Sequence, residues 1–212
     1  MTKHDSLLRK PSPGRRPVAH GLRSWVARFL DRTRARMSTE AVYLDTETTG
    51  LFGDVRIVEV AIVDDAGTVL INTLVNPQIR IPADATAIHG IDDSDVAAMP
   101  TIHDLMVHVD DAIRDRPVVI YNASYDQRLF PGQLHAARSV LCAMRRFKLL
   151  PFAVGNGNGT LAKAASWAGH AWTGTAHRAL ADALAARTVW QHLDRQGVPM
   201  AAGRRVGGWR RS

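Results

Sequence analysis

The chain has 212 residues, of which 46% are hydrophobic and 22% are charged, a length and composition that exclude fibrous and wholly disordered proteins. Its single cysteine, Cys142, excludes an internal disulfide and a multi-cysteine zinc site, which favours a reducing, cytoplasmic location. The net charge of +7 favours a polyanionic partner, and the lack of long apolar runs predicts neither a membrane span nor a secretory signal.

Residues 1–39 form a predicted basic arm, with ten Lys or Arg residues against two Asp residues. Its first 21 residues combine Pro and Gly with no apolar periodicity, which indicates disorder. In residues 22–36, apolar side chains recur at helical spacing among arginines, which predicts a basic amphipathic helix. This helix would dock on the core, on a partner or on an anionic surface, or the arm is an organelle-targeting segment before an alternative start at Met37.

The predicted domain covers residues 40–194 and opens with three strands. Residues 41–46, 56–64 and 67–75 are apolar runs rich in strand-forming residues. The last two runs flank a short turn at Asp65, Ala66 and Gly67, so the three strands are expected to form an antiparallel meander.

The rest of the domain is predicted to alternate between helices and strands. Residues 102–113 show amphipathic helical spacing that ends before Pro117, and residues 117–121 are typical of a buried strand. The later elements expected are helices near 124–136, 142–150, 160–169 and 177–194, a strand at 139–142 and a loop at 155–159. This order favours an α/β fold, in which helices cover a mixed sheet.

Residues 195–212 form a second predicted basic tail, with five Arg residues and no acid. The domain between the two arms carries 12 basic and 18 acidic residues. Basic arms attract nucleic acid, whereas an acidic centre repels it unless cations neutralise some of the carboxylates. The charge distribution therefore favours a metal and a nucleic acid together, with solvated tails as the alternative.

Asp45 and Glu47 stand at the end of the first predicted strand, where side chains two residues apart point to one face and Thr46 faces away. Hard divalent cations prefer such oxygen ligands, and two ions about 3.5 to 4 Å apart can contact the attacking and leaving oxygens of a phosphodiester. Alone, the pair is also typical of a solvated turn. Residues 48–50, Thr-Thr-Gly, add hydroxyls and a flexible turn suited to a nucleotide terminus.

Asp126 follows the predicted strand at 117–121, and open α/β sheets place their sites at such strand ends. The alternative is an acid in the first turn of a helix, favoured by the helix dipole. Its neighbour Tyr125 offers a ring on which a base can stack, or it packs in the core. His89 contacts substrate, packs, or is a turn residue before a helix near Asp92.

His177 and Asp182 are five residues apart, which is about 140° around a regular helix, so they share a site best if His177 precedes the helix. A neutral histidine, with an ordinary pKa near about 6.5, can take a proton from an attacking water at neutral pH. A surface or capping histidine is the alternative.

Four segments of this chain resemble, in order and spacing, the motifs of the DEDDh exonucleases, the DnaQ-like group that includes the proofreading epsilon subunit of bacterial DNA polymerase III. The segments are LDTETTGL at 44–51, AIHGI at 87–91, VIYNASYDQRLF at 119–130 and HRALAD at 177–182. The sequence departs from many members at Leu141-Cys142, where they have Asp-Thr, and neither basic arm belongs to the pattern.

The resemblance implies a ribonuclease H-like fold, with three antiparallel strands, further parallel strands and flanking helices. It implies that two Mg²⁺ ions, for which Mn²⁺ can substitute, are held by Asp45, Glu47, Asp126 and Asp182. It assigns the general base to His177, and contacts with the terminal nucleotide to Thr48, Thr49, Gly50, Leu51, His89 and Tyr125. Water then attacks the terminal phosphodiester, and a nucleoside 5′-monophosphate leaves.

The leading hypothesis is a 3′ to 5′ exonuclease that acts on single-stranded or frayed DNA ends, in proofreading or repair, with a polymerase as a candidate partner. A second hypothesis keeps the chemistry and makes RNA the substrate, because no residue can be tied to reading the 2′-hydroxyl. A third makes the chain a non-catalytic adaptor that binds nucleic acid through its arms.

Overall fold

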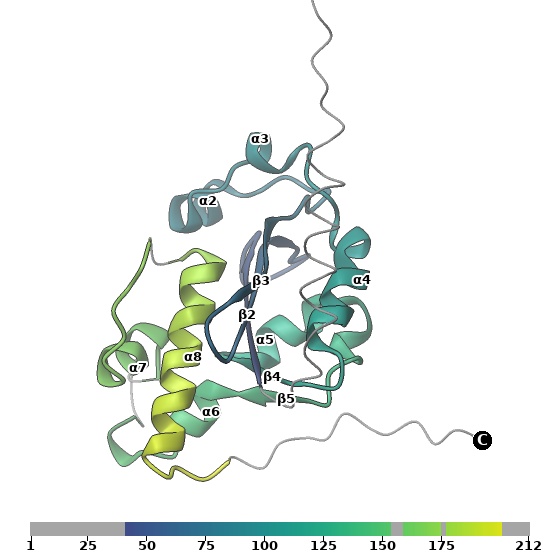
Figure 1. The fold of residues 1–212 in the computed structure, drawn as a ribbon. Coiled ribbons are helices and arrows are strands. Elements are labelled where there is room, and N and C mark those ends of the chain that lie inside the picture. Colours follow the sequence, from purple (N-terminus) through teal and green to yellow (C-terminus); the bar gives the residue numbers. More distant parts are fainter. Residues whose placement is uncertain (1–40, 154–158, 175–176, 201–212) are drawn as a thin grey trace, which may run out of the picture. The chain divides into compact units, whose positions relative to one another are not determined.

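The computed structural model describes residues 41–153, 159–174 and 177–200, which surround a five-stranded sheet of order β3-β2-β1-β4-β5 (Figure 1). The five strands are β1 (Val42–Thr48), β2 (Ile57–Asp64), β3 (Val69–Leu74), β4 (Pro117–Ile120) and β5 (Ser139–Cys142). The first three pair antiparallel, and β4 and β5 extend the sheet in parallel from the other edge of β1. This arrangement confirms the predicted meander and mixed sheet.

Short and long helices flank the sheet (Figure 1). They are α2 (Ala83–His89), α3 (Asp93–Val96), α4 (Ile102–Ile113), α5 (Ala123–Asp126), α6 (Ala143–Phe147), α7 (Leu161–Trp167) and α8 (Ala179–Arg195). None of the helices in the described part of the chain combines the length and the apolar character that a bilayer crossing requires. The predicted helices near α4, α6, α7 and α8 are confirmed.

The face of the sheet beneath α8 is built by strand alternation. On β1, Tyr43 opposes Val63 of β2, and Asp45 opposes Ala61. Tyr43, Ala61 and Val63 belong to the buried cluster that packs against α6, α7 and α8. Because side chains two apart on a strand share a face, this side of the sheet is apolar at one end and becomes acidic towards the carboxyl end of β1.

Alanines allow α8 to lie close to this face of the sheet. Ala179, Ala183 and Ala186 are fully buried, and the helix contacts β1, β2 and β4. Their small side chains leave room for the strand residues beneath, and burial of this face holds the helix in place. The first turn of α8 therefore lies over the acidic end of β1.

The prediction of a helix over 124–136 is wrong for most of that range. α5 ends at Asp126, two short 3₁₀ segments follow it, and Phe130 between them is extended. Pro131 disfavours helical backbone at the preceding residue, and Gly132 has a φ of 71°. The chain therefore turns where a regular helix was expected.

The helix α2 was not among the predicted elements, because its seven residues are too few for a clear helical period. It ends at His89, where Gly90 adopts a φ of 73° and donates its N–H to the carbonyl of Thr86. Glycine adopts this left-handed conformation without a steric cost. The predicted arm at 1–39 and the tail beyond residue 200 lie outside the described residues, so the predicted division of the chain stays a prediction.

Candidate active site

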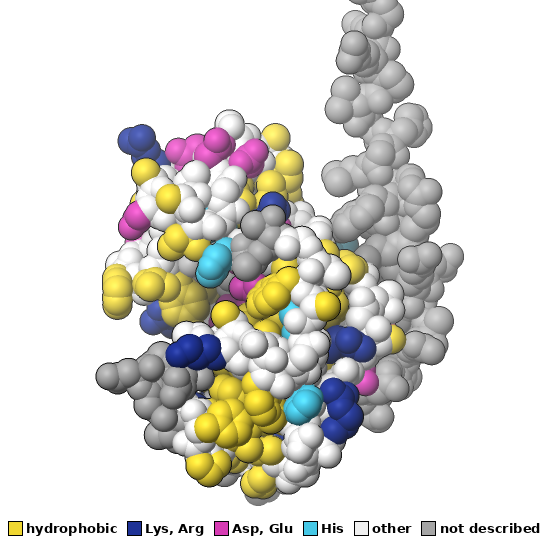
Figure 2. All heavy atoms as spheres, turned by 90° about the vertical axis from the view of Figure 1, so that its left-hand side faces the viewer, with side chains coloured by type: hydrophobic (Ala, Val, Ile, Leu, Met, Phe, Trp, Pro, Cys, Tyr) yellow, Lys and Arg dark blue, Asp and Glu magenta, His cyan; other side chains and the backbone are white. Residues whose placement is uncertain are grey.

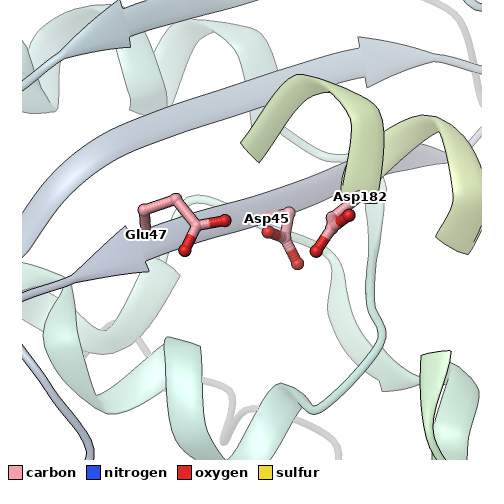
Figure 3. A group of neighbouring side chains, drawn as sticks. All are labelled: Asp45, Glu47 and Asp182. Carbon is pink, nitrogen blue, oxygen red and sulfur yellow. The ribbon is translucent and has the colours of Figure 1, made fainter. Parts of the chain in front are cut away.

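Three carboxylates from two distant segments converge at the acidic end of the sheet. Asp45 and Glu47 project from β1, and Asp182 projects from the first turn of α8 towards the same space (Figure 3). One oxygen from each of the three lies within 4.8 Å of the others. Figure 2 shows acidic side chains near the centre of the face that carries α7 and α8.

The electrostatics of this cluster are unfavourable without a cation. Burial and then neighbouring carboxylates, Asp126 first among them, raise the pKa of Asp45 well above its ordinary value. Burial, followed by the charges of Asp182 and Glu59, raises the pKa of Glu47 to about 8. The pKa of Asp182 is raised mainly by burial. Like charges brought together in a partly buried site favour a proton or a bound cation.

Asp126 flanks the cluster of three and does not belong to it. It lies at the end of α5 and is 5% exposed. The hydroxyl of Thr46 donates to its Oδ1 at 2.7 Å. Burial raises the pKa of Asp126 to about 6, although the Thr46 hydrogen bond and the Arg128 charge lower it. Its charge reaches Asp45, so all four predicted carboxylates share one electrostatic environment.

His177 lies two residues before α8 begins, in a left-handed conformation with a φ of 63°. Its side chain is exposed. Burial raises the pKa of Asp182, and His177 offsets part of that rise, first through its charge and then through a hydrogen bond from its backbone. His177 therefore precedes the helix, as the spacing argument required, and lies beside the last of the four carboxylates.

The predicted nucleotide-binding residues after β1 form a loop held by its own hydroxyls. Tyr125 donates to the carbonyl of Gly50, and the hydroxyls of Tyr125 and Thr48 are 2.8 Å apart. Thr49 is buried and accepts from the backbone N–H of Arg56. These bonds fix the loop at the carboxyl end of β1, while the side chain of Leu51 is 65% exposed at its tip.

His89 and Tyr125 border this loop from different elements. His89 is buried, its Nδ1 accepts from the backbone N–H of Ile91, and its pKa is lowered mainly by burial. The Tyr125 ring faces the guanidinium of Arg128 at 4.9 Å. The structure thus brings both residues to the loop that follows Asp45 and Glu47.

The donor set suits a hard divalent cation. Oδ1 of Asp182 is buried and has no hydrogen-bond partner, and burial of an unpaired carboxylate oxygen is costly. All three converging side chains offer oxygen ligands, which Mg²⁺, Mn²⁺ and Ca²⁺ prefer. A bound cation would satisfy the Asp182 oxygen and offset the repulsion within the cluster.

Three residues at the site were not among the predicted ones. They are Thr46, which holds Asp126, and the ion pair of Glu59 with Arg178. Glu59 carried a signal, because it is the one acid inside the apolar run IVEVAIV of β2. A buried acid in such a run requires a partner, although the run does not say which residue provides it.

Comparison with known proteins agrees with this geometry. The RNase_T family model, described as an exonuclease, matches residues 42–189. A protein of Escherichia phage 186 named uncharacterized exonuclease CP81 is 37% identical over 172 residues, which are 74% of this chain and 89% of the phage protein.

Two solved structures share the fold. Exonuclease X in complex with 5′ overhanging duplex DNA is 27% identical, with a TM-score of 0.62 over 76% of this chain and 95% of the other. The nuclease domain of 3′hExo, a DEDDh family member bound to rAMP, is 12% identical, with a TM-score of 0.65 over 80% of this chain and 98% of the other. These likenesses confirm the predicted ribonuclease H-like fold.

Proposed function

The chain belongs to the RNase_T exonuclease family, whose DEDDh (DnaQ-like) members are metal-dependent 3′ to 5′ exonucleases, and we propose that it removes nucleotides from single-stranded or frayed 3′ ends of DNA. The convergence of Asp45, Glu47 and Asp182, together with the buried Oδ1 of Asp182 that has no hydrogen-bond partner, supports this proposal most strongly. DNA is favoured as the substrate because Exonuclease X, a relative of known structure that is 27% identical to this chain, was solved with DNA.

In this proposal the four carboxylates hold two Mg²⁺ ions, with Mn²⁺ as a substitute. Asp45, Glu47 and Asp182 supply converging oxygens, and Asp126 supplies the flanking carboxylate that Thr46 orients. When bound, such ions supply positive charge that stabilises the attacking and leaving oxygens of a phosphodiester. The metals also explain how an acidic site receives a polyanion.

His177 acts as the general base and takes the proton of the attacking water. Its exposed ring beside Asp182 can reach water that enters the site. The loop at Thr48, Thr49, Gly50 and Leu51 borders the terminal nucleotide, with His89 of α2 and Tyr125 of α5 nearby. Tyr125 holds the loop through its hydrogen bond to the Gly50 carbonyl. The product is a nucleoside 5′-monophosphate.

Oligonucleotides labelled at either end test direction, cofactor and activity together. With Mg²⁺, a 3′-labelled strand should release labelled mononucleotide at once, and a 5′-labelled strand should give a ladder that shortens with time. EDTA should stop both reactions, and Mn²⁺ should restore them. Release of labelled mononucleotide from the 5′ end first would contradict the proposed direction.

Matched DNA and RNA strands test the choice of sugar in the same assay. Faster degradation of DNA, measured as kcat/KM, supports the proposal. Faster degradation of RNA would make the enzyme an exoribonuclease with the same chemistry, because the 2′-hydroxyl is the group that tells the two polymers apart. A polymerase partner stays a prediction from the family resemblance.

Replacing His177 with alanine should lower kcat by about 10²- to 10⁴-fold, the usual contribution of a general base. KM and the thermal transition should change little, because the side chain is exposed and precedes the helix. Steady-state kinetics on a DNA oligonucleotide measure both constants. Added imidazole should restore part of the rate in this variant, and a rate equal to wild type would remove His177 from the mechanism.

A further inference from the structure

We propose that Glu59 and Arg178 are positioning residues for this active site, since their ion pair fixes the start of α8 and so sets where His177 and Asp182 lie against β1. The roles of His177 and Asp182 rest on the proposed function. The ion pair itself rests on independent contacts between β2 and the residue that precedes α8.

Both oxygens of the Glu59 carboxylate are engaged by the entry to α8. Arg178 donates to Oε1 through Nη2 at 2.6 Å and to Oε2 through Nε at 3.0 Å. The backbone N–H of Ala179, the first residue of α8, donates to Oε2 at 2.9 Å. A two-pronged ion pair fixes direction as well as distance, and Glu59 lies buried at its centre.

The helix α8 has no N-cap side chain of its own, so the contact with Glu59 serves as its N-terminal cap. Arg178 occupies the N-cap position of α8, and no side chain there accepts a hydrogen bond from the first turn. Glu59 takes over that role from a strand about 120 residues earlier in the chain. Its negative charge also lies at the helix N-terminus, where the macrodipole favours an anion.

The register of the sheet relates the start of α8 to the carboxylates of β1. Glu59 lies directly opposite Glu47 in the β1–β2 pairing, so the helix start is tied to the row that carries a predicted ligand. The ion pair of Glu59 with Arg178 acts as a clamp on the start of α8. The N–H of Asp182 donates to the carbonyl of Arg178, which places Asp182 one turn beyond this clamp. A shift of the clamp would therefore move Asp182 and His177 together relative to Asp45.

The contacts assign Glu59 to positioning and not to ligation. Its oxygens already accept from the Arg178 fork and from the Ala179 N–H, whereas Oδ1 of Asp182 has no partner. Burial raises the pKa of Glu47, and the positive charge of the Arg178 guanidinium beside the cluster offsets part of that rise. Glu59 is therefore a paired anion next to three converging carboxylates.

The other end of α8 supplies a matched control. Arg146 of α6 is 3% exposed, pairs with Asp194 near the C-terminal end of α8 at 2.6 Å, and donates to the carbonyl of Val198. This second arginine clamp holds the same helix, but it lies at the end away from the carboxylates. Replacement of either arginine by lysine keeps the charge and removes the fork.

The test uses the charge-conserving variants Glu59→Asp, Arg178→Lys and Arg146→Lys in the full chain. Calorimetry with Mn²⁺ gives the metal Kd, steady-state assays with Mg²⁺ give kcat and KM, and thermal melts give Tm. Glu59→Asp and Arg178→Lys should each weaken Mn²⁺ binding and lower kcat by about 10- to 100-fold, the usual cost of losing a group that orients a ligand. KM should stay within about threefold of wild type, because the contacts that bind the substrate equally in the ground state and the transition state are kept.

Arg146→Lys should lower Tm as much as the other two variants and leave kcat and the Mn²⁺ Kd within about twofold of wild type, because its contacts are distant from the carboxylates. The double variant Glu59→Asp/Arg178→Lys should lose no more Mn²⁺ affinity and kcat than the more impaired of the two single variants, because both substitutions break the same ion pair. If all three single variants lower Tm and none changes the Mn²⁺ Kd or kcat, the pair is only structural and the proposal fails. A wild-type protein that binds Mn²⁺ and digests no nucleic acid would overturn the proposed function, while the Kd comparison would still decide the clamp.

Discussion

Replacing Asp45 with asparagine should lower kcat by about 10³-fold or more and, at pH 8, raise the Tm of the metal-free protein. Asp45 supplies one of the three converging carboxylates of the proposed metal site. Loss of the metal's stabilisation of charge in the transition state costs several kcal/mol, and each increment of about 1.4 kcal/mol lowers the rate tenfold. The same side chain is repelled by Asp126, Asp182 and Glu47. Asparagine keeps the shape and removes that repulsion.

Opposite changes in activity and stability separate a site residue from a structural one. The kinetics use Mg²⁺ and a DNA oligonucleotide, and the melts are run with EDTA. Asp111→Asn is the control, since this acid lies on α4 and pairs with Arg114 at the surface. The control should keep its kcat. Full Mg²⁺-dependent activity in Asp45→Asn would remove Asp45 from the proposed metal site.

The metal-free protein should lose stability as the pH rises from about 5 to about 8. The pKa of Glu47 is raised from 4.5 to about 8 and that of Asp126 from 3.8 to about 6, in both cases mainly by burial. A raised carboxyl pKa gives stability that is fully present below the unfolded-state value and is lost as pH rises through the folded-state value. At about 1.4 kcal/mol per pKa unit the loss amounts to a few kcal/mol, or about 5 to 10 °C in Tm.

Mg²⁺ should reverse this loss, and more strongly at pH 8 than at pH 5. Cations bind the ionised carboxylates, so protons compete with them at low pH. Thermal melts across this pH range, with EDTA and with excess Mg²⁺, measure both effects. Glu47→Gln should flatten the metal-free profile, because it removes a carboxyl group whose pKa burial raises to about 8. A Tm in EDTA that does not depend on pH would contradict the buried, repelling cluster.

The proposed clamp and the predicted catalytic groups meet in the first turn of α8. His177, Arg178 and Asp182 are five positions apart at most, yet each faces a different partner. His177 is exposed beside the site, Arg178 reaches Glu59, and Asp182 reaches the carboxylates of β1. One short segment therefore supplies a predicted base, a positioning cation and a predicted ligand.

The local elements could be predicted where their side-chain period was clear. The strands β1, β2 and β3 are runs rich in apolar, strand-forming residues, and the helix α4 shows a sustained period of 3.6 residues, so the local pattern identified each of them. The range 124–136 failed because Pro131 and a positive φ at Gly132 break a pattern that otherwise fits a helix. The helix α2 failed for the opposite reason, since it is too short to show a period.

By itself the sequence determined the antiparallel meander, the acid pair at the end of β1 and the need for His177 to precede a helix. Each of these follows from the fixed geometry of neighbouring residues, which holds in any fold. Only the tertiary structure decided that Thr46 holds Asp126, 80 positions away, and that Glu59 holds Arg178, 119 positions away. Strand register and the packing of α8 on the sheet set those pairs, and neither is written in the residues that lie next to them in the chain.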